Sequence, residues 1–188
     1  WWGPLDSRDD YVAREWYCTM VRGIDYMATR PELGNMSRLV VRGGSQGGAL
    51  ALVTAALDHR VAWCLADSPS NCMLHDSVDP AKYSSFGPTA GQVPEGQTLD
   101  DLQRTLSYYD PAHLAQFIEC PTVIGVNVGD MCVHSLGGLS AYHNLRKVPE
   151  DKKWFLPGVR GHAHSNSAEA GGKTREVLDL VAGQSNPG

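Results

Sequence analysis

RLVVRGGSQGGALAL, residues 38–52, decides how this chain folds. It begins with a β-branched run typical of a buried strand, passes through four glycines around Ser45 and Gln46, and continues into an alanine-rich run of high helix propensity. Residues 43–47 match the pattern G-x-S-x-G between a strand and a helix. Glycine avoids side-chain clashes at such a sharp turn, and the serine hydroxyl projects at the carboxyl end of the strand. The stretch therefore predicts a nucleophile elbow with Ser45 as the nucleophile.

Two other interpretations of these glycines are a turn that serves only the fold and a loop that cradles a phosphate. The stretch lacks the pattern G-x-x-x-x-G-K-[ST], and the chain contains no G-x-G-x-x-G. The succession of strand, turn and helix favours the nucleophile over both.

Short apolar runs alternate with helical patterns along the rest of the chain. Larger apolar residues recur at spacings of three and four over residues 9–29, which predicts a helix with one buried face. Strands are predicted at residues 39–41, 61–67, 122–129 and 152–158, and further helices at residues 49–58, from 99 onward, at 136–145 and at 169–181. Strands that alternate with helices indicate a parallel sheet with right-handed crossovers, an α/β architecture.

Length and composition indicate one domain. A chain of 188 residues with 42% hydrophobic content can bury a core but is too short for two comfortable domains. We expect a single, partial domain over residues 1–188, with an irregular Ser/Pro/Gly-rich insertion at about residues 68–106.

Charge and hydropathy exclude several classes of partner. The net charge is −5 and no basic block exceeds a pair, so we expect no nucleic-acid partner. Apolar runs are too short to cross a bilayer, and the first residues lack the pattern of a signal peptide. We expect a soluble chain, with the cytoplasm favoured and a targeting segment ahead of Trp1 left open. The five scattered cysteines contain no C-x-x-C and are expected to be reduced.

A serine hydroxyl needs a base to take its proton, so the elbow requires an acid and a histidine further along the chain. Asp130 directly follows the predicted strand 122–129 and is the favoured acid, with Asp67 as the alternative. His162 lies in a glycine-containing loop after the last predicted strand and is the favoured base, with His164 as its rival. A turn aspartate and a solvated loop histidine are the non-catalytic alternatives. Surface or turn positions are predicted for His59, His75, His113 and His143.

A metal site is a third hypothesis for the same region. Its ligands would be Asp130, His134, His162 and His164. The His-x-His spacing is weak by itself, and a metal leaves the glycine elbow unexplained. We therefore expect no metal.

Three segments resemble a known family: YVAREWYC…DSPSNC (residues 11–72), SYYDPAHL…AYHNL (residues 107–145) and KKWFLPGVRGH (residues 152–162). They are similar to the acetyl xylan esterase and cephalosporin C deacetylase family of α/β-hydrolases. The resemblance implies a mostly parallel sheet with helices on both faces, and hydrolysis of acetyl esters on sugars or small alcohols without a cofactor.

The resemblance also implies roles for individual residues. Ser45 would be the nucleophile, Asp130 the acid that orients the base, and His162 the general base and later acid. The backbone N–H of Gln46 would donate one hydrogen bond to the oxyanion. Ala163 follows His162 where family members usually have glutamate.

The family pattern further includes strands ahead of the elbow strand, a second oxyanion donor and an Arg-Gly-Gln motif, none of which this chain contains. Without those strands, the apolar edge of the predicted strand at residues 39–41 is exposed, and such edges are normally covered by another element. We therefore expect a homo-oligomer or a partner chain over that edge. Two alternative functions are a half-domain that is noncatalytic or depends on complementation, and an α/β-hydrolase with peptidase-like or dienelactone-hydrolase-like specificity.

Overall fold

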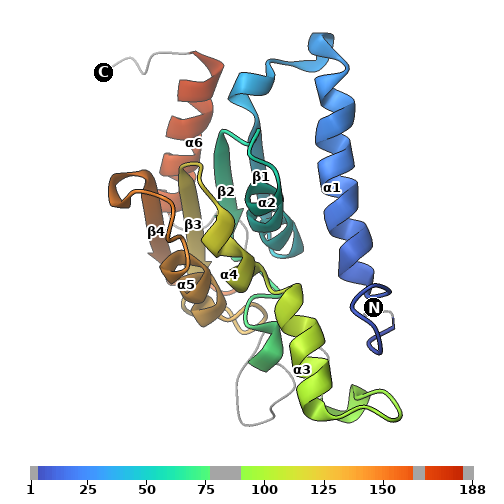
Figure 1. The fold of residues 1–188 in the computed structure, drawn as a ribbon. Helices are drawn as coiled ribbons and strands as arrows, with labels where there is room; N and C mark the ends of the chain where they lie inside the picture. The colour runs from blue at the N-terminus through green and yellow to red at the C-terminus, as the bar shows by residue number, and fades with distance from the viewer. Residues whose placement is uncertain (1–3, 77–89, 163–167, 184–188) are drawn as a thin grey trace.

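The computed structural model describes residues 4–76, 90–162 and 168–183. Its four strands form one sheet in chain order, and every neighbouring pair is parallel (Figure 1). The strands are β1 (Val40–Gly44), β2 (Trp63–Asp67), β3 (Thr122–Asn127) and β4 (Lys153–Gly158). The predicted parallel sheet is confirmed.

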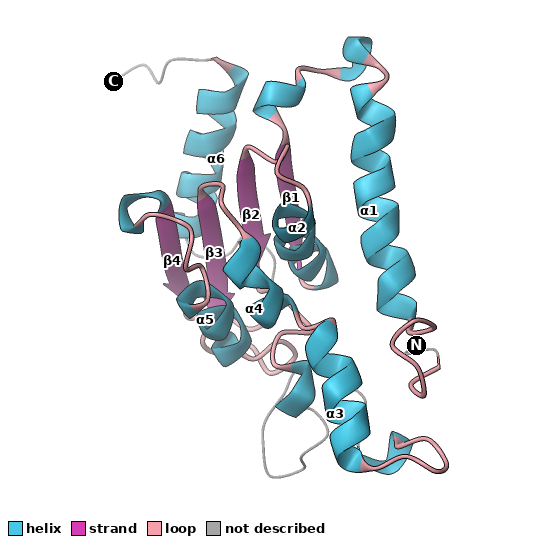
Figure 2. Cartoon of the chain, in the orientation of Figure 1, coloured by secondary structure: helices cyan, strands magenta, loops and turns pink. Residues whose placement is uncertain are grey.

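Helices cover both faces of the sheet (Figure 2). The helices are α1 (Val12–Ala28), α2 (Gln46–Leu57), α3 (Leu99–Tyr108), α4 (Pro111–Leu114), α5 (Ser135–His143) and α6 (Ala168–Ala182). One face packs Val41, Cys64 and Ile124 against α2 and α5, and the other packs Leu65 and Val123 against α6. Alternate residues of each strand thus serve opposite layers, as expected for a sheet buried on both faces.

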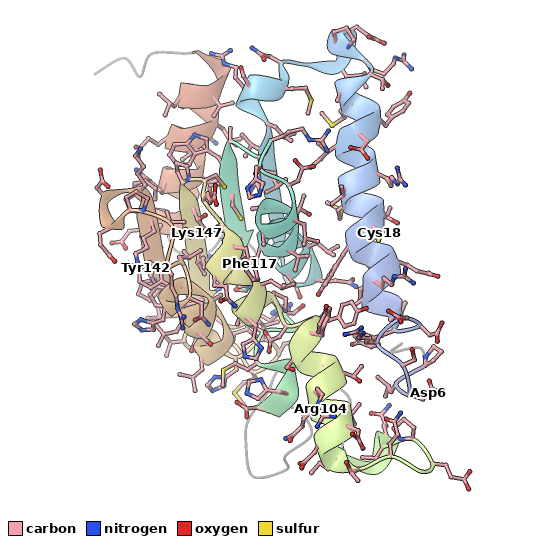
Figure 3. The ribbon with its side chains drawn as sticks, in the orientation of Figure 1. Asp6, Cys18, Arg104, Phe117, Tyr142 and Lys147 are labelled. Carbon is pink, nitrogen blue, oxygen red and sulfur yellow. The ribbon has the colours of Figure 1, made fainter. Side chains whose placement is uncertain are left out.

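Side chains fill the space between α5 and the sheet (Figure 3). Tyr142 of α5 packs against Phe155 of β4, with ring centroids 5.5 Å apart. The Nζ of Lys153 lies 5.3 Å from the centroid of the Tyr142 ring. This packing holds β4 in place at one edge of the sheet.

The predicted boundaries at the elbow were wrong by a few residues. β1 continues past Val41 to Gly44 because Gly43 and Gly44 pair with Ala66 and Asp67 of β2. The helix begins at Gln46 rather than at residue 49. The glycines lower the intrinsic propensity for either element, but pairing with β2 and packing of α2 outweigh that preference.

A second apolar cluster joins α1 to α3. Leu102 and Leu106 of α3 are fully buried against Tyr11 and Tyr17. Tyr17 donates its hydroxyl to the carbonyl of Tyr109 at 2.6 Å, and burial raises the pKa of Tyr17. The range predicted as an irregular insertion, residues 68–106, includes most of α3, which agrees with the helix predicted from residue 99 onward and buries only one face. Residues 77–89 lie outside the described residues.

Two expectations about the whole chain can be compared with the described residues. None of the helices there has the length and hydropathy that a bilayer crossing requires. All five cysteines are free thiols, as their spacing predicted.

Candidate active site

Ser45 has a strained backbone at the junction of β1 and α2. Its φ is 54° and its ψ is −120°, a combination that costs a non-glycine residue on the order of 1–3 kcal/mol. Its N–H donates to the carbonyl of Asp67 at 2.9 Å, and its carbonyl accepts from Ala49 at 3.1 Å and from Ser70 at 3.0 Å. Three backbone hydrogen bonds therefore hold the serine in a conformation it would not adopt alone.

The glycines around Ser45 are not equivalent. A Cβ on Gly43 would overlap the carbonyl of Gly47, and a Cβ on Gly48 would lie 2.8 Å from the carbonyl oxygen of Asp67. A Cβ on Gly47 would meet nothing within 4 Å. The expectation that both glycines of the motif avoid a clash is therefore correct for Gly43 and wrong for Gly47, because α2 directs that position outward, into a groove beside β1.

The backbone N–H of Gln46 belongs to the first turn of α2. The first N–H groups of an α-helix have no acceptor within the helix, and they carry the positive end of the helix dipole. Gln46 directly follows Ser45, so this donor lies next to the serine where an oxyanion would form. The geometry is suited to one half of an oxyanion hole.

The structure joins Asp130 and His162. The Nδ1 of His162 lies 2.8 Å from the Oδ2 of Asp130, and the Oδ1 of Asp130 accepts the N–H groups of Cys132 and Val133, each at 2.8 Å. Burial would raise the pKa of this carboxyl, but the hydrogen bonds from Val133, His162 and Cys132 outweigh burial and lower the pKa. Asp130 is therefore a fixed carboxylate that accepts the Nδ1–H of the histidine.

Two loops that follow β3 and β4 bring these side chains together. Val128 donates its N–H to the carbonyl of Gly158 at 2.8 Å, which continues the pairing of the two strands. A Cβ on Gly129 would lie 3.2 Å from the carbonyl oxygens of Val159 and Arg160. The loops pack backbone to backbone, so the residues just beyond them, Asp130 and His162, meet.

Ser45, Asp130 and His162 follow the carboxyl ends of β1, β3 and β4. In a parallel sheet these ends lie along one edge, which is where α/β folds place their ligands. The described contacts bring Asp130 and His162 into a hydrogen bond, whereas Ser45 is placed only at the same edge. About 29% of the His162 side chain is exposed while that of Asp130 is fully buried, so the histidine is the member of the pair that a substrate can reach.

The alternative residues that the structure describes have other contacts. The carboxylate of Asp67 faces Gly125, where an added Cβ would approach its Oδ1 to 3.1 Å, and Ala170 of α6 borders the same position. His134 accepts the N–H of Leu136 at 3.3 Å and so caps α5. His164 and Ala163 lie outside the described residues.

Metal-ligand spacing occurs in one group among the described residues, His75, Asp110 and His113. The proposed metal ligands Asp130, His134 and His162 do not form such a group there. From the sequence, His75 and His113 are predicted only as surface or turn residues, because no spacing in the sequence joins His75 to the distant loop of Asp110 and His113.

Comparison with known proteins identifies the family of this chain. Residues 2–156 match the model of the acetyl xylan esterase (AXE1) family. Over 125 residues the chain is 37% identical to acetyl esterase Axe7A of Xylanibacter ruminicola, which covers 64% of this chain and 26% of that protein.

Solved structures show the same fold. An acetyl xylan esterase from Paenibacillus sp. R4 superposes with a TM-score of 0.75 at 25% identity, covering 95% of this chain and 55% of that one. Acetyl xylan esterase 1 from Thermoanaerobacterium sp. JW/SL YS485 also gives 0.75, at 22% identity, with 94% and 55% covered. The chain therefore spans about half the length of these enzymes, and about a quarter of the acetyl esterase. It has an α/β-hydrolase fold and belongs to the acetyl xylan esterase family.

Proposed function

We propose that this chain carries the catalytic triad of a serine carboxylic-ester hydrolase that removes acetyl groups from acetylated sugars, xylan or related small esters. The observation that carries the proposal is the 2.8 Å contact between His162 and Asp130, at the sheet edge that also holds the strained Ser45. Membership of the acetyl xylan esterase family supports the acetyl ester as the substrate class.

The hydrogen bond to Asp130 sets the protonation of the His162 ring. A carboxylate only accepts, so Nδ1 of His162 carries the proton and Nε2 of the neutral ring carries a lone pair. That lone pair takes the proton of Ser45 while Oγ forms a bond to the acetyl carbonyl carbon. The N–H of Gln46 stabilises the resulting oxyanion.

The tetrahedral intermediate on Ser45 then breaks down in two steps, and His162 returns each proton that it takes. The bond between the carbonyl carbon and the alcohol oxygen breaks, and His162 gives its proton to that oxygen. Water, deprotonated by His162, then attacks the acetyl group on Ser45, and acetate leaves as the serine regains its proton. The lowered pKa of Asp130 keeps its charge at neutral pH, so the carboxylate stabilises the transient imidazolium.

Labelling and turnover test this proposal. A fluorophosphonate probe should label the chain at Ser45, and p-nitrophenyl acetate turnover should be lost in Ser45→Ala but retained in the matched control Ser37→Ala, an exposed serine. A folded chain with neither labelling nor turnover would overturn the proposal. Release of acetate from acetylated xylo-oligosaccharides, measured beside cleavage of an acyl-peptide and of a dienelactone, decides among the related specificities.

A second candidate is a half-domain that works only when another polypeptide covers β1. Among the described strands, β1 pairs on one side only, and a groove of about 350 Å³ lies between β1, α1 and α2. Apolar side chains of Met20, Ile24 and Met27 line this groove. Exposed strand edges of this kind are normally covered, here by a second copy or by a partner chain.

The dependence of activity on protein concentration distinguishes the two candidate functions. If assembly is needed, activity per chain should rise with concentration together with the mass measured by light scattering. A monomer whose activity per chain is constant over that range would remove the second candidate.

A further inference from the structure

His75, Asp110 and His113 form a cluster outside the candidate active site. Each offers a ligand atom, and these atoms all lie within 4.8 Å of one another. His75 belongs to the short helical turn Leu74–Asp76 after β2, whereas Asp110 and His113 lie at the start of α4. The two histidine rings stack with centroids 5.0 Å apart and an interplanar angle of 25°.

Asp110 is fixed and fully buried. It is the N-cap of α4, followed by Pro111, and its carboxylate accepts the N–H groups of Met73 at 3.0 Å, Leu74 at 2.7 Å and Ala112 at 2.8 Å. Three neutral donors orient this carboxylate without cancelling its charge. A fully buried carboxylate calls for a cation close by.

A second buried carboxylate, that of Asp76, adds to the negative charge. Its Oδ1 lies 3.5 Å from the Nε2 of His75, and the Nδ1 of the same ring lies 3.5 Å from the Oδ2 of Asp110. The two carboxylates therefore place two negative charges around one imidazole. A divalent cation matches that charge when both histidines are neutral.

The spacing between His75 and Asp110 suits two ligands of one metal ion. Their 3.5 Å separation exceeds the usual 2.7–3.2 Å of a hydrogen bond from nitrogen to oxygen. Two ligands held at ~2.0–2.1 Å from a tetrahedral zinc ion are separated by ~3.3 Å.

The backbone contact of His113 selects the tautomer that a ligand requires. Its Nδ1 lies 3.1 Å from the carbonyl oxygen of Ser107. Since a carbonyl only accepts, Nδ1 donates, and Nε2 of the neutral ring carries the lone pair. A backbone carbonyl that holds the other ring nitrogen is the usual support of a metal-ligating histidine.

We propose that His75, Asp110 and His113 bind one divalent transition-metal ion of the zinc class, with Asp76 supplying further negative charge. Two imidazoles and one carboxylate favour such an ion over magnesium or calcium, which prefer oxygen ligands. The ion ties the turn after β2 to the junction of α3 and α4, two segments that are distant in the sequence. Its role is structural, and the proposal does not depend on the esterase activity.

Zinc binding to the chelator-treated chain tests this proposal. Titration of zinc against a chromophoric chelator, with elemental analysis after dialysis, should show one zinc per chain, and zinc should raise the midpoint of thermal unfolding. His113→Gln and His75→Gln should each weaken zinc binding at least tenfold. The controls His59→Gln, an exposed histidine, and His162→Gln should bind zinc like the unmodified chain.

Cobalt supplies a readout that does not depend on the variants. One equivalent of Co²⁺ should give the visible absorption bands of a tetrahedral nitrogen and oxygen site. The proposal is overturned by an unmodified chain that binds no stoichiometric zinc or cobalt, by equal binding in His75→Gln and His113→Gln, or by loss of zinc in His162→Gln.

Discussion

Two buried aspartates, Asp130 and Asp110, illustrate how similar residues acquire different roles. Each follows the same local rule, with a carboxylate that accepts backbone N–H groups from the residues just after it. Asp130 contacts His162 at 2.8 Å, whereas Asp110 lies 3.5 Å from His75, which also faces Asp76. The single 2.8 Å contact of Asp130 orients His162, which is partly exposed. The two 3.5 Å separations around the His75 ring belong to the cluster for which we propose a divalent cation.

The largest difference between the two aspartates should appear in catalysis. Asp130→Asn removes the acceptor that keeps the proton on Nδ1 of His162, so we expect kcat for p-nitrophenyl acetate to fall by about 10⁴-fold. The labelling rate of Ser45 by a fluorophosphonate should fall with it. Asp110→Asn, measured on chain shown to be folded by circular dichroism, should keep kcat within a few-fold. Equal losses in the two variants would contradict separate roles.

The free energy of unfolding should depend strongly on Asp110. Asp110→Ala leaves the buried N–H groups of Met73, Leu74 and Ala112 without their acceptor, and each such loss costs about 1–3 kcal/mol. We expect urea denaturation to show a decrease of about 3 kcal/mol or more in the free energy of unfolding. The more exposed capping box of α3 provides a matched control, since Asp101→Ala removes the acceptor of the Thr98 N–H and should cost only about 1 kcal/mol. A similar small cost for both would show that Asp110 does not hold these loops together.

The alignment of Asp130 with His162 should depend on Gly129. A Cβ there would lie 3.2 Å from two carbonyl oxygens of the opposite loop, so Gly129→Ala should push the loops apart. We expect kcat to fall by roughly tenfold, since small misplacements of catalytic groups reduce rates strongly. Gly161→Ala is the matched control, because its nearest atom would be 3.9 Å away. An unchanged kcat in Gly129→Ala would show that the loops adapt without moving the pair.

The smallest expected effect is the pH dependence of the free energy of unfolding. The pKa of Asp130 is lowered from 3.8 in the folded chain, so its charge stabilises the fold at pH values above the pKa of the unfolded chain. This contribution should be constant from neutral pH to about pH 5 and should be lost as pH falls through the lowered folded value. The difference in unfolding free energy between the chain and Asp130→Asn should therefore shrink only below about pH 4. A difference that stays constant from neutral pH to well below pH 4 would show that the pKa of Asp130 is not lowered.

Local pattern and the geometry of parallel sheets made much of the active site predictable. The apolar runs that became β1, β3 and β4 could be recognised from composition, and residues that follow such strands meet at one edge of the sheet. Asp130 and His162 could be paired in advance for that reason, and the hydrogen bond between them agrees with it. The precise start of α2 and the open space at Gly47 could not be predicted, because both depend on how α2 packs on the sheet.

The sequence by itself determined the order of the strands and helices along the chain and predicted the turn at Ser45 and the pair of Asp130 and His162, because these depend on short-range pattern, on one rule of topology and on the family resemblance. Only the tertiary structure decided that His75 meets Asp110 and His113, and that Asp110 is buried without solvent. These residues come from a short turn and a short helix in separate loops, which carry no periodicity. Their meeting is set by the packing of α3 and α4 against the rest of the core, and no local pattern encodes that packing.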